Sequence, residues 1–309
     1  MSMTAIWGLI QTALELGTVC SLTVLALFLS YSMLNVCDLS TDGCFTLGAA
    51  VGAVVAISGH PWLSIPAAMA AGVLSGFVTA VLQTRMGIDS LLAGIIVNTG
   101  LYSINIAVMG KSSLLNMNKT ETIFTKAKAL LADTPLSGQY ELIIGLTAAA
   151  LVIVFLALFL RTRLGLAIRA TGNNPDMVRS SSINPVFTTT VGLCVANAFT
   201  GLSGCLLAQS QKSVNIDIGS GMVTIALASL LIGQTFFGKG SITKRAVGMV
   251  VGSIVFRLVY TVALRFNMPA FMLKLVSSVI VIIAIAGPYF KSQLSTVRRR
   301  LAGSGKGAR

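Results

Sequence analysis

Charged side chains are scarce in this sequence. They make up 10% of its 309 residues, whereas hydrophobic residues make up 55%. A soluble globular domain carries about 25% charged residues, so the deficit excludes an ordinary soluble fold and indicates a membrane protein. Thirty glycines against seven prolines agree with closely packed membrane helices.

Metal-binding and catalytic patterns are also lacking. His60 is the one histidine, and the five cysteines form no C-x-x-C pair, whereas structural zinc needs about four grouped thiolates or imidazoles. No nucleophile elbow, zinc-protease motif or pair of catalytic carboxylates is present. The run from Gly233 to Gly240 imitates a nucleotide-binding loop, but Gly240 stands where Ser or Thr would reach Mg²⁺. We therefore expect no catalytic residues, no metal and no cofactor on this chain.

Acidic residues are few as well, with 9 against 22 lysines and arginines and a net charge of +13. In a soluble protein such an excess indicates a nucleic-acid partner. Here the basic residues gather at the ends of apolar runs, which the preference of lysine and arginine for the cytoplasmic side explains better. We expect contact with membrane lipid and none with nucleic acid.

Long apolar runs fill most of the chain. A membrane helix needs about 20 such residues, so the pattern predicts an all-α polytopic protein with about eight to ten transmembrane helices, some short or broken. Residues 45–57 are too few to span the membrane and indicate a broken or tilted helix, or part of a longer buried element. The predicted helices cover residues 5–34, 62–84, 90–109, 140–160, 186–209, 222–237, 244–264 and 270–290.

Lysine and arginine predict the orientation. If the stretch from Arg161 to Arg179 lies inside, the alternation of helices also places Arg85, the basic cluster at 239–245 and the tail 291–309 inside. These segments hold most of the basic residues, as cytoplasmic loops do. We therefore expect a cytoplasmic C-terminus.

The same assignment predicts the domain organisation. Residues 1–290 form a single transmembrane domain, and residues 291–309 form a basic cytoplasmic tail. Residues 110–139 form an external loop with a helical run at 121–131, which is too short for a separate domain. Residues 161–185 form a cytoplasmic loop.

Several polar residues lie within or beside apolar runs and are candidates for a substrate path, because embedded polar groups are unfavourable unless they serve a function. They are Asp38, Asp42, Asn98, Asn105, Asn197 and Asp217. For the aspartates the alternative is capping of helix N-termini. For the asparagines it is hydrogen bonding between helices, and both alternatives stay open.

One basic residue is expected to be buried. Arg257 lies in the middle of the predicted helix 244–264, so it must face protein or a water-filled cavity. Lys274 is close enough to the outer end of helix 270–290 to reach the membrane surface.

Three G-x-x-x-G pairs occur inside apolar runs, at Gly48/Gly52, Gly72/Gly76 and Gly248/Gly252. Small residues at this spacing let helix backbones approach closely. We expect them to lie at helix contacts, within the chain or between two copies.

The two halves of the chain share a weak echo. Residues 38–43 lead into an apolar run of small residues, and residues 215–221 do the same in the second half. Transporters often consist of two related halves with irregular backbone beside the transport path. An internal repeat is therefore a hypothesis for this chain.

The longest polar stretch between apolar runs is Arg161 to Pro185, which carries four arginines and one acid. Its pattern, R-x-R-x-G-x-A-I-R-A-x-G-x-N-x-x-x-x-R-x-x-x-I-N, resembles the cytoplasmic loop of bacterial ABC importer permeases of the branched-chain amino-acid and ribose superfamily. Residues 38–51, 91–95 and 99–105 are similar to a subgroup of these permeases, some of them linked to tryptophan or tyrosine uptake. The resemblance extends over about residues 5–290.

The resemblance implies a function and partners. Such a chain would be a permease subunit in the bacterial cytoplasmic membrane. Two copies would form the path for a small solute, which the resemblance implies to be an amino acid. Two cytoplasmic ATPase subunits would bind ATP and Mg²⁺, and an external substrate-binding lipoprotein would deliver the solute.

The resemblance also implies a coupling helix that docks on the ATPase. The local sequence agrees, since Gly172 can end one helix and Asn173 or Asn174 can cap a short new one that starts at Pro175. Relatives usually carry glycine where Ser182 stands, which leaves the exit from this helix open. The residues implied in ATPase coupling are Arg169, Gly172, Asn173, Asn174, Pro175, Met177 and Arg179.

Two other classes of function remain. An ion- or proton-coupled secondary transporter would work without ATPase subunits and would need embedded acids for its ion. An integral-membrane enzyme would need a polar catalytic cluster at one depth, which the sequence does not contain.

Overall fold

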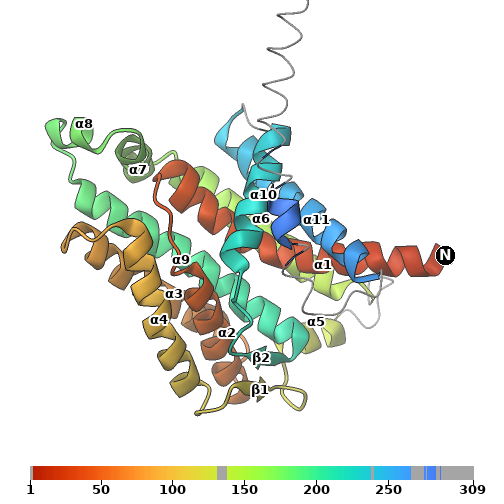
Figure 1. Cartoon of the computed structure of the whole chain (residues 1–309). Coiled ribbons are helices and arrows are strands. Elements are labelled where there is room, and N and C mark those ends of the chain that lie inside the picture. Colours follow the sequence, from red (N-terminus) through yellow and green to blue (C-terminus); the bar gives the residue numbers. More distant parts are fainter. Residues whose placement is uncertain are drawn as a thin grey trace, which may run out of the picture.

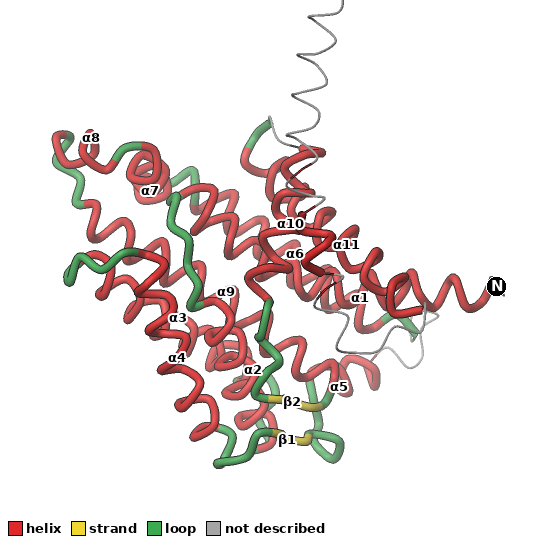
Figure 2. Tube along the Cα trace, viewed as in Figure 1, coloured by secondary structure: helices red, strands yellow, loops and turns green. Residues whose placement is uncertain are grey.

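The computed structural model describes residues 3–130, 138–237, 240–265, 275, 277–282 and 286, and helices dominate this part of the chain (Figures 1 and 2). The long helices are α1 (Met3–Leu27), α3 (Ser64–Thr84), α4 (Ser90–Val108), α6 (Tyr140–Phe159), α9 (Pro185–Gln211) and α11 (Ile242–Arg265). The shorter elements are the π-helix η1 (Phe28–Met33), α2 (Thr41–Ile57), β1 (Leu114–Asn116), α5 (Ile123–Leu130), α7 (Arg163–Asn173), α8 (Pro175–Ser180), β2 (Ser213–Asn215) and α10 (Met222–Phe237). The predicted all-α class is confirmed.

Six helices in the described residues are long and apolar enough to cross a membrane. They match the predicted helices from 5–34 to 244–264, apart from 222–237. Helices α2 and α10 are apolar but have only 17 and 16 residues, so short helices occur as predicted. The predicted helix 270–290 lies largely outside the described residues, and so do Lys274 and the tail 291–309.

Helix α9 lies at the centre of the bundle and packs against α1, α2 and α3 (Figure 1). All of its residues from Ala196 to Gln209 are buried. Glycines make this possible, because a Cβ on Gly204 would overlap with the carbonyl oxygen of Phe45. Lipid tails are as apolar as leucine, so close backbone contact of this kind holds membrane helices together.

The three G-x-x-x-G pairs all lie at helix contacts inside the chain, which confirms their predicted role in packing. Gly48 and Gly52 on α2 and Gly72 and Gly76 on α3 face α9, while Gly248 and Gly252 on α11 face α10.

The first crossing is interrupted. Helix α1 changes at Leu27 into η1, whose wider turns end at Met33, and irregular backbone follows as far as Asp38. The predicted helix 5–34 is thus nearly correct in extent, but Phe28–Met33 is π-helical and the helix ends before Leu34. Such π-helical turns often occur at functional sites.

The two ends of the bundle differ, as Figure 1 shows. One end carries α7 and α8, and we call it the α8 end. The other carries the antiparallel pair β1–β2 together with α5, and we call it the β end. The segment from η1 through α2 connects them, since Met33 of η1 contacts α7 and the last residues of α2 pack with β2.

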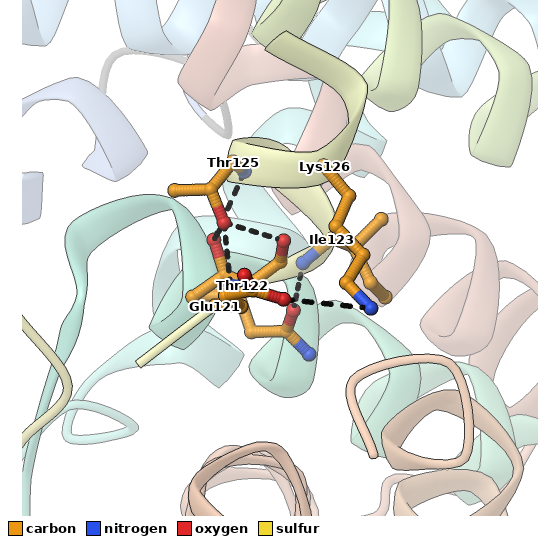
Figure 3. Close-up of polar contacts among 6 residues, drawn as sticks. Glu121, Thr122, Ile123, Thr125 and Lys126 are labelled. Carbon is orange, nitrogen blue, oxygen red and sulfur yellow. Dashed lines mark hydrogen bonds and ion pairs between the residues drawn. The ribbon is translucent and has the colours of Figure 1, made fainter. Parts of the chain in front are cut away.

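Helix α5 is fixed to the β end by its first turn (Figure 3). Thr122 and Thr125 cap it reciprocally, each hydroxyl accepting a hydrogen bond from the backbone N–H of the other. The N–H of Ile123 donates to the buried Oε1 of Gln209 on α9 over 2.9 Å. This helix falls within the predicted helical run 121–131.

Arg257 is buried, as predicted. Its side chain lies between α11 and α1, where a guanidinium N–H donates to the sulfur of Cys20 over 2.8 Å. The guanidinium carbon also lies 5.7 Å from the centre of the Tyr260 ring, a cation–π contact that partly compensates a buried charge.

Candidate functional site

Helices α7 and α8 project from one end of the bundle (Figure 1). The side-chain oxygen of Asn174 accepts hydrogen bonds from the N–H groups of Asp176 and Met177, over 3.1 and 3.0 Å. Pro175 follows as the first helical residue, where its missing N–H leaves no bond unmade. The predicted start of a helix at Pro175 with Asn174 as its cap is confirmed, whereas Asn173 ends α7.

The outer surface of α8 has an apolar tip beside a charge. Met177 is 66% exposed, and Arg179 forms an exposed ion pair of 3.7 Å with Asp176. Val178 points the other way and is buried. Arg169 on α7 is half-buried. Helix α8 is therefore anchored by one residue and presents the others outward.

Gly172 does not end α7, contrary to the prediction. The helix continues to Asn173, and Gly172 instead lies against the backbone of Met33 and Leu34. A Cβ at this position would overlap with the carbonyl oxygen of Met33. Glycine therefore lets α7 touch the irregular segment that leads from η1 into the bundle.

The chain leaves α8 through Ser182, which has a φ of 59°. This left-handed conformation disfavours residues with a Cβ by roughly 1–2 kcal/mol and leaves glycine free. We expect Ser182→Gly to fold at least as well as the unchanged chain. We expect Ser182→Val to lower the melting temperature, because a β-branched residue adopts this φ even less readily than serine does. Thermal unfolding in detergent measures both, and equal melting temperatures of the two variants would contradict the assignment.

A polar pocket of about 440 Å³ lies between α2, α4 and the segment before α10. It contains four of the six predicted path residues, Asp42, Asn98, Asn105 and Asp217, but neither Asp38 nor Asn197. Small-molecule sites usually have volumes of about 300–1,000 Å³, so the pocket is large enough for a small solute. We call it the polar pocket.

Asp42 connects two short helices at the wall of the polar pocket. It lies in the first turn of α2, yet its carboxylate accepts hydrogen bonds from the N–H groups of Gly221 and Val223, over 2.9 and 2.8 Å. It therefore caps α10, and Asp217 does not take that position. The carboxylate also offsets the positive end of the α10 dipole.

Helices α2 and α10 begin side by side and run to opposite ends of the bundle. The last turns of α2 reach the β end. Gln234 near the end of α10 donates to Ser32 of η1, over 2.8 Å, at the α8 end. The two similar segments, residues 38–43 and 215–221, thus lie side by side. At this contact, the N–H of Gly219 donates to the hydroxyl of Thr46. Two half-length helices with adjoining N-termini are a common construction at transport sites.

Asp38 and Asn197 are bonded to each other instead of lining the polar pocket. The amide of Asn197 on α9 donates to the Asp38 carboxylate over 2.8 Å, and both residues are buried. The other oxygen of Asp38 accepts from the N–H and hydroxyl of Ser40. This network fixes the turn before α2 to the central helix, which agrees with the interhelical alternative for Asn197. Asp38 does not cap α2, whose N-cap is Ser40.

Helix α4 carries a polar stripe toward the polar pocket. Asn98, Thr99, Tyr102 and Ser103 follow helical spacing and line it, and the last three are exposed. Elsewhere the exposed residues of α4 are apolar, among them Ile96. Lipid offers no hydrogen bonds to hydroxyl and amide groups, so the stripe indicates an aqueous path or a second protein surface.

Residues 9–285 match the family described as branched-chain amino acid transport system / permease component. The chain belongs to this permease family. A tyrosine transport system permease protein of Clostridioides difficile is 31% identical over 268 residues, which is 86% of each chain. A guanosine ABC transporter permease protein of Bacillus subtilis is 28% identical over 188 residues, which is 56% of this chain and 57% of that protein.

Among solved structures, PsaBC from Streptococcus pneumoniae in complex with Fab is similar with a TM-score of 0.50 and 16% sequence identity. The similarity covers 89% of each chain. At this identity it shows the shared fold of the permease.

The sequence did not reveal all residues that line the polar pocket of the permease. Thr46, Thr99, Tyr102 and Ser103 also line it. They are polar residues at helical spacing inside an apolar run, which is the pattern of a helix with one face toward water.

Among the described residues, no group of three or more His, Cys, Asp or Glu could hold a metal ion.

Proposed function

We propose that this permease is the membrane subunit of an ATP-driven importer in the bacterial cytoplasmic membrane. Two copies would form the path, two separate ATPase subunits would bind ATP and Mg²⁺, and an external binding protein would deliver the solute. The observation that carries the proposal is the capped helix α8, which projects from the bundle with Met177 and Arg179 exposed. An exposed apolar tip beside a guanidinium suits a groove with an acidic rim.

The orientation follows from this assignment. The α8 end would face the cytoplasm, together with the basic tail, and the β end would face the binding protein. The excess of lysine and arginine on the segments assigned to the cytoplasm supports this arrangement.

The solute we propose is an amino acid, and an aromatic one is favoured. The support is the tyrosine transport system permease protein, which is similar along 86% of its length. Relatives that match shorter parts of the chain or at lower identity are named for guanosine, fructose and ribose, so the family as a whole serves several solute classes.

A continuous set of contacts leads from α8 to the polar pocket. Helix α7 touches the backbone of Met33 and Leu34 through Gly172. That segment continues to Asp38, which is held on α9, and then to α2. Asp42 of α2 caps α10. Closure of the ATPases on ATP binding would move α8, and these contacts would pass the movement to the residues around the solute.

Co-expression with a candidate ATPase and a candidate binding protein, chosen from the genes that neighbour this one, tests the proposal. We expect the ATPase to co-purify with the permease, and we expect proteoliposomes containing the three proteins to take up labelled tyrosine when ATP is supplied on the ATPase side. A Walker-motif variant of the ATPase is the control and should abolish uptake. Uptake by the purified permease alone under an ion or proton gradient would reject the proposal and favour a secondary transporter.

A further inference from the structure

The polar pocket offers hydrogen-bond acceptors without a cation. Asp42 and Asp217 line it with carboxylates, and Asn98 and Asn105 line it with amides. No lysine, arginine or histidine is among the described residues around it. The local field is therefore negative and attracts a positively charged group.

Asn105 supplies an acceptor that lacks a partner. The residue is 1% exposed, and its side-chain amide N–H donates to the carbonyl oxygen of Gly43 over 3.1 Å. That bond fixes the orientation of the amide, so the opposite atom is the oxygen. The oxygen is buried and has no hydrogen-bond partner in the described residues. A buried acceptor without a partner is unfavourable, and a ligand that donates a hydrogen bond would relieve it.

Asp217 supplies a second acceptor at the rim. Its backbone N–H is held by the side chain of Asn215 over 3.1 Å, which fixes the turn that carries it. Its carboxylate is in no ion pair among the described residues, and the residue is exposed. A charged acceptor on a fixed turn beside a polar pocket is suited to a cationic ligand.

We propose that the polar pocket binds the ammonium group of the transported solute, with the Asn105 oxygen and the Asp217 carboxylate as its acceptors. An ammonium group has three donors and no acceptor, which is the complement of these two residues. Tyr102 and Ser103 line the same pocket from α4, and their hydroxyls can donate to a carboxylate. The proposal rests on the proposed function, because it specifies which part of an amino-acid solute the permease recognises.

Binding to the purified full chain in lipid nanodiscs tests this without the ATPase. The probes are L-tyrosine, tyramine, which lacks the carboxylate, and 3-(4-hydroxyphenyl)propionate, which lacks the amine. We expect tyrosine and tyramine to raise the melting temperature at millimolar concentration and the amine-free acid to leave it unchanged. A larger shift with the acid than with tyramine would overturn the proposal.

Two variants assign the effect to the polar pocket. We expect Asp217→Asn to weaken tyramine binding about tenfold, the usual loss for a hydrogen bond to a charged group. Its matched control is Asp89→Asn, which removes the same charge at the start of α4 and keeps an oxygen to cap Leu91. Asn105→Leu should also weaken binding, and Asp217→Asn serves alone if that variant does not fold. Equal affinity of Asp217→Asn and Asp89→Asn would overturn the proposal.

The experiments distinguish failure of the importer assignment from failure of the ammonium site. Amine binding without ATP-driven uptake would keep the ligand assignment and reject the importer. ATP-driven tyrosine uptake with no preference for amines in nanodiscs would keep the importer and reject the ammonium site.

Discussion

Replacement of Gly204 by leucine is expected to prevent the helix bundle from assembling. Gly204 lies where α9 crosses α2, and a Cβ there would be 3.0 Å from the carbonyl carbon of Phe45 and 3.1 Å from the backbone nitrogen of Ala49. Backbone atoms cannot rotate away as a side chain can, so the two helices would have to separate. Overpacking by a few methylene groups costs roughly 1–3 kcal/mol when a core can adjust, and this crossing cannot adjust locally. We expect aggregation on size-exclusion chromatography in detergent.

A matched pair of alanine variants tests the same crossing with a smaller change. A Cβ on Gly100 of α4 would have no neighbouring atom within 4 Å. Gly100→Ala should therefore be neutral, or should stabilise the fold by up to about 1 kcal/mol, because alanine favours the helix over glycine. Gly204→Ala gains the same helix propensity but meets the backbone of α2, so it should lower the melting temperature. Equal shifts for the two variants would show that the α2–α9 crossing is looser than the structure has it.

Local rules explain why much of the fold was predictable. Long apolar runs set the spanning helices because each must be about 20 residues long to cross lipid. Asn174 followed by Pro175 set the start of α8, because both the cap and its donors lie within three residues. In each case the deciding partner is a sequence neighbour or the membrane itself.

Contacts distant in sequence explain what was missed. Asp42 follows the pattern of a cap for its own helix, yet it caps α10, 179 residues away at Gly221. Gly172 follows the pattern of a helix stop, yet it provides room for Met33. The π-helical turn after Leu27 lies within one long, mostly apolar run, so periodicity alone could not locate it.

The candidate site was predicted in part for the same reason. Embedded polar residues are recognisable one by one, and Asp42, Asn98, Asn105 and Asp217 do line one pocket. Which of them meet depends on how α2, α4 and the segment before α10 come together. Asp38 and Asn197 have the same sequence character but bond to each other.

Reversal of charge at Arg179 is expected to abolish ATP-driven uptake and leave the fold intact. Arg179 is exposed, and its pair with the still more exposed Asp176 contributes about 0–1 kcal/mol to stability. In a docked complex, a like-charge contact costs several kcal/mol, so Arg179→Glu should lower association with the ATPase by more than about a hundredfold. Pull-down of the ATPase and the melting temperature of the purified variant separate the two effects. A variant that binds the ATPase and transports normally would reject α8 as the docking element.

A graded series at Asn174 then tests whether the shape of α8 matters as well as its charge. Asn174→Asp keeps an oxygen for the N–H groups of Asp176 and Met177 and should support uptake, whereas Asn174→Ala loses this cap, which is worth about 1 kcal/mol. Asn174→Pro also loses the N–H that donates to Ala170 and cannot adopt the observed φ of −159°. We therefore expect uptake to fall from Asp through Ala to none with Pro, while the protein still inserts in the membrane. Asn174 does not line the polar pocket, so equal uptake by all three variants would show that ATPase movement reaches the bundle by another route.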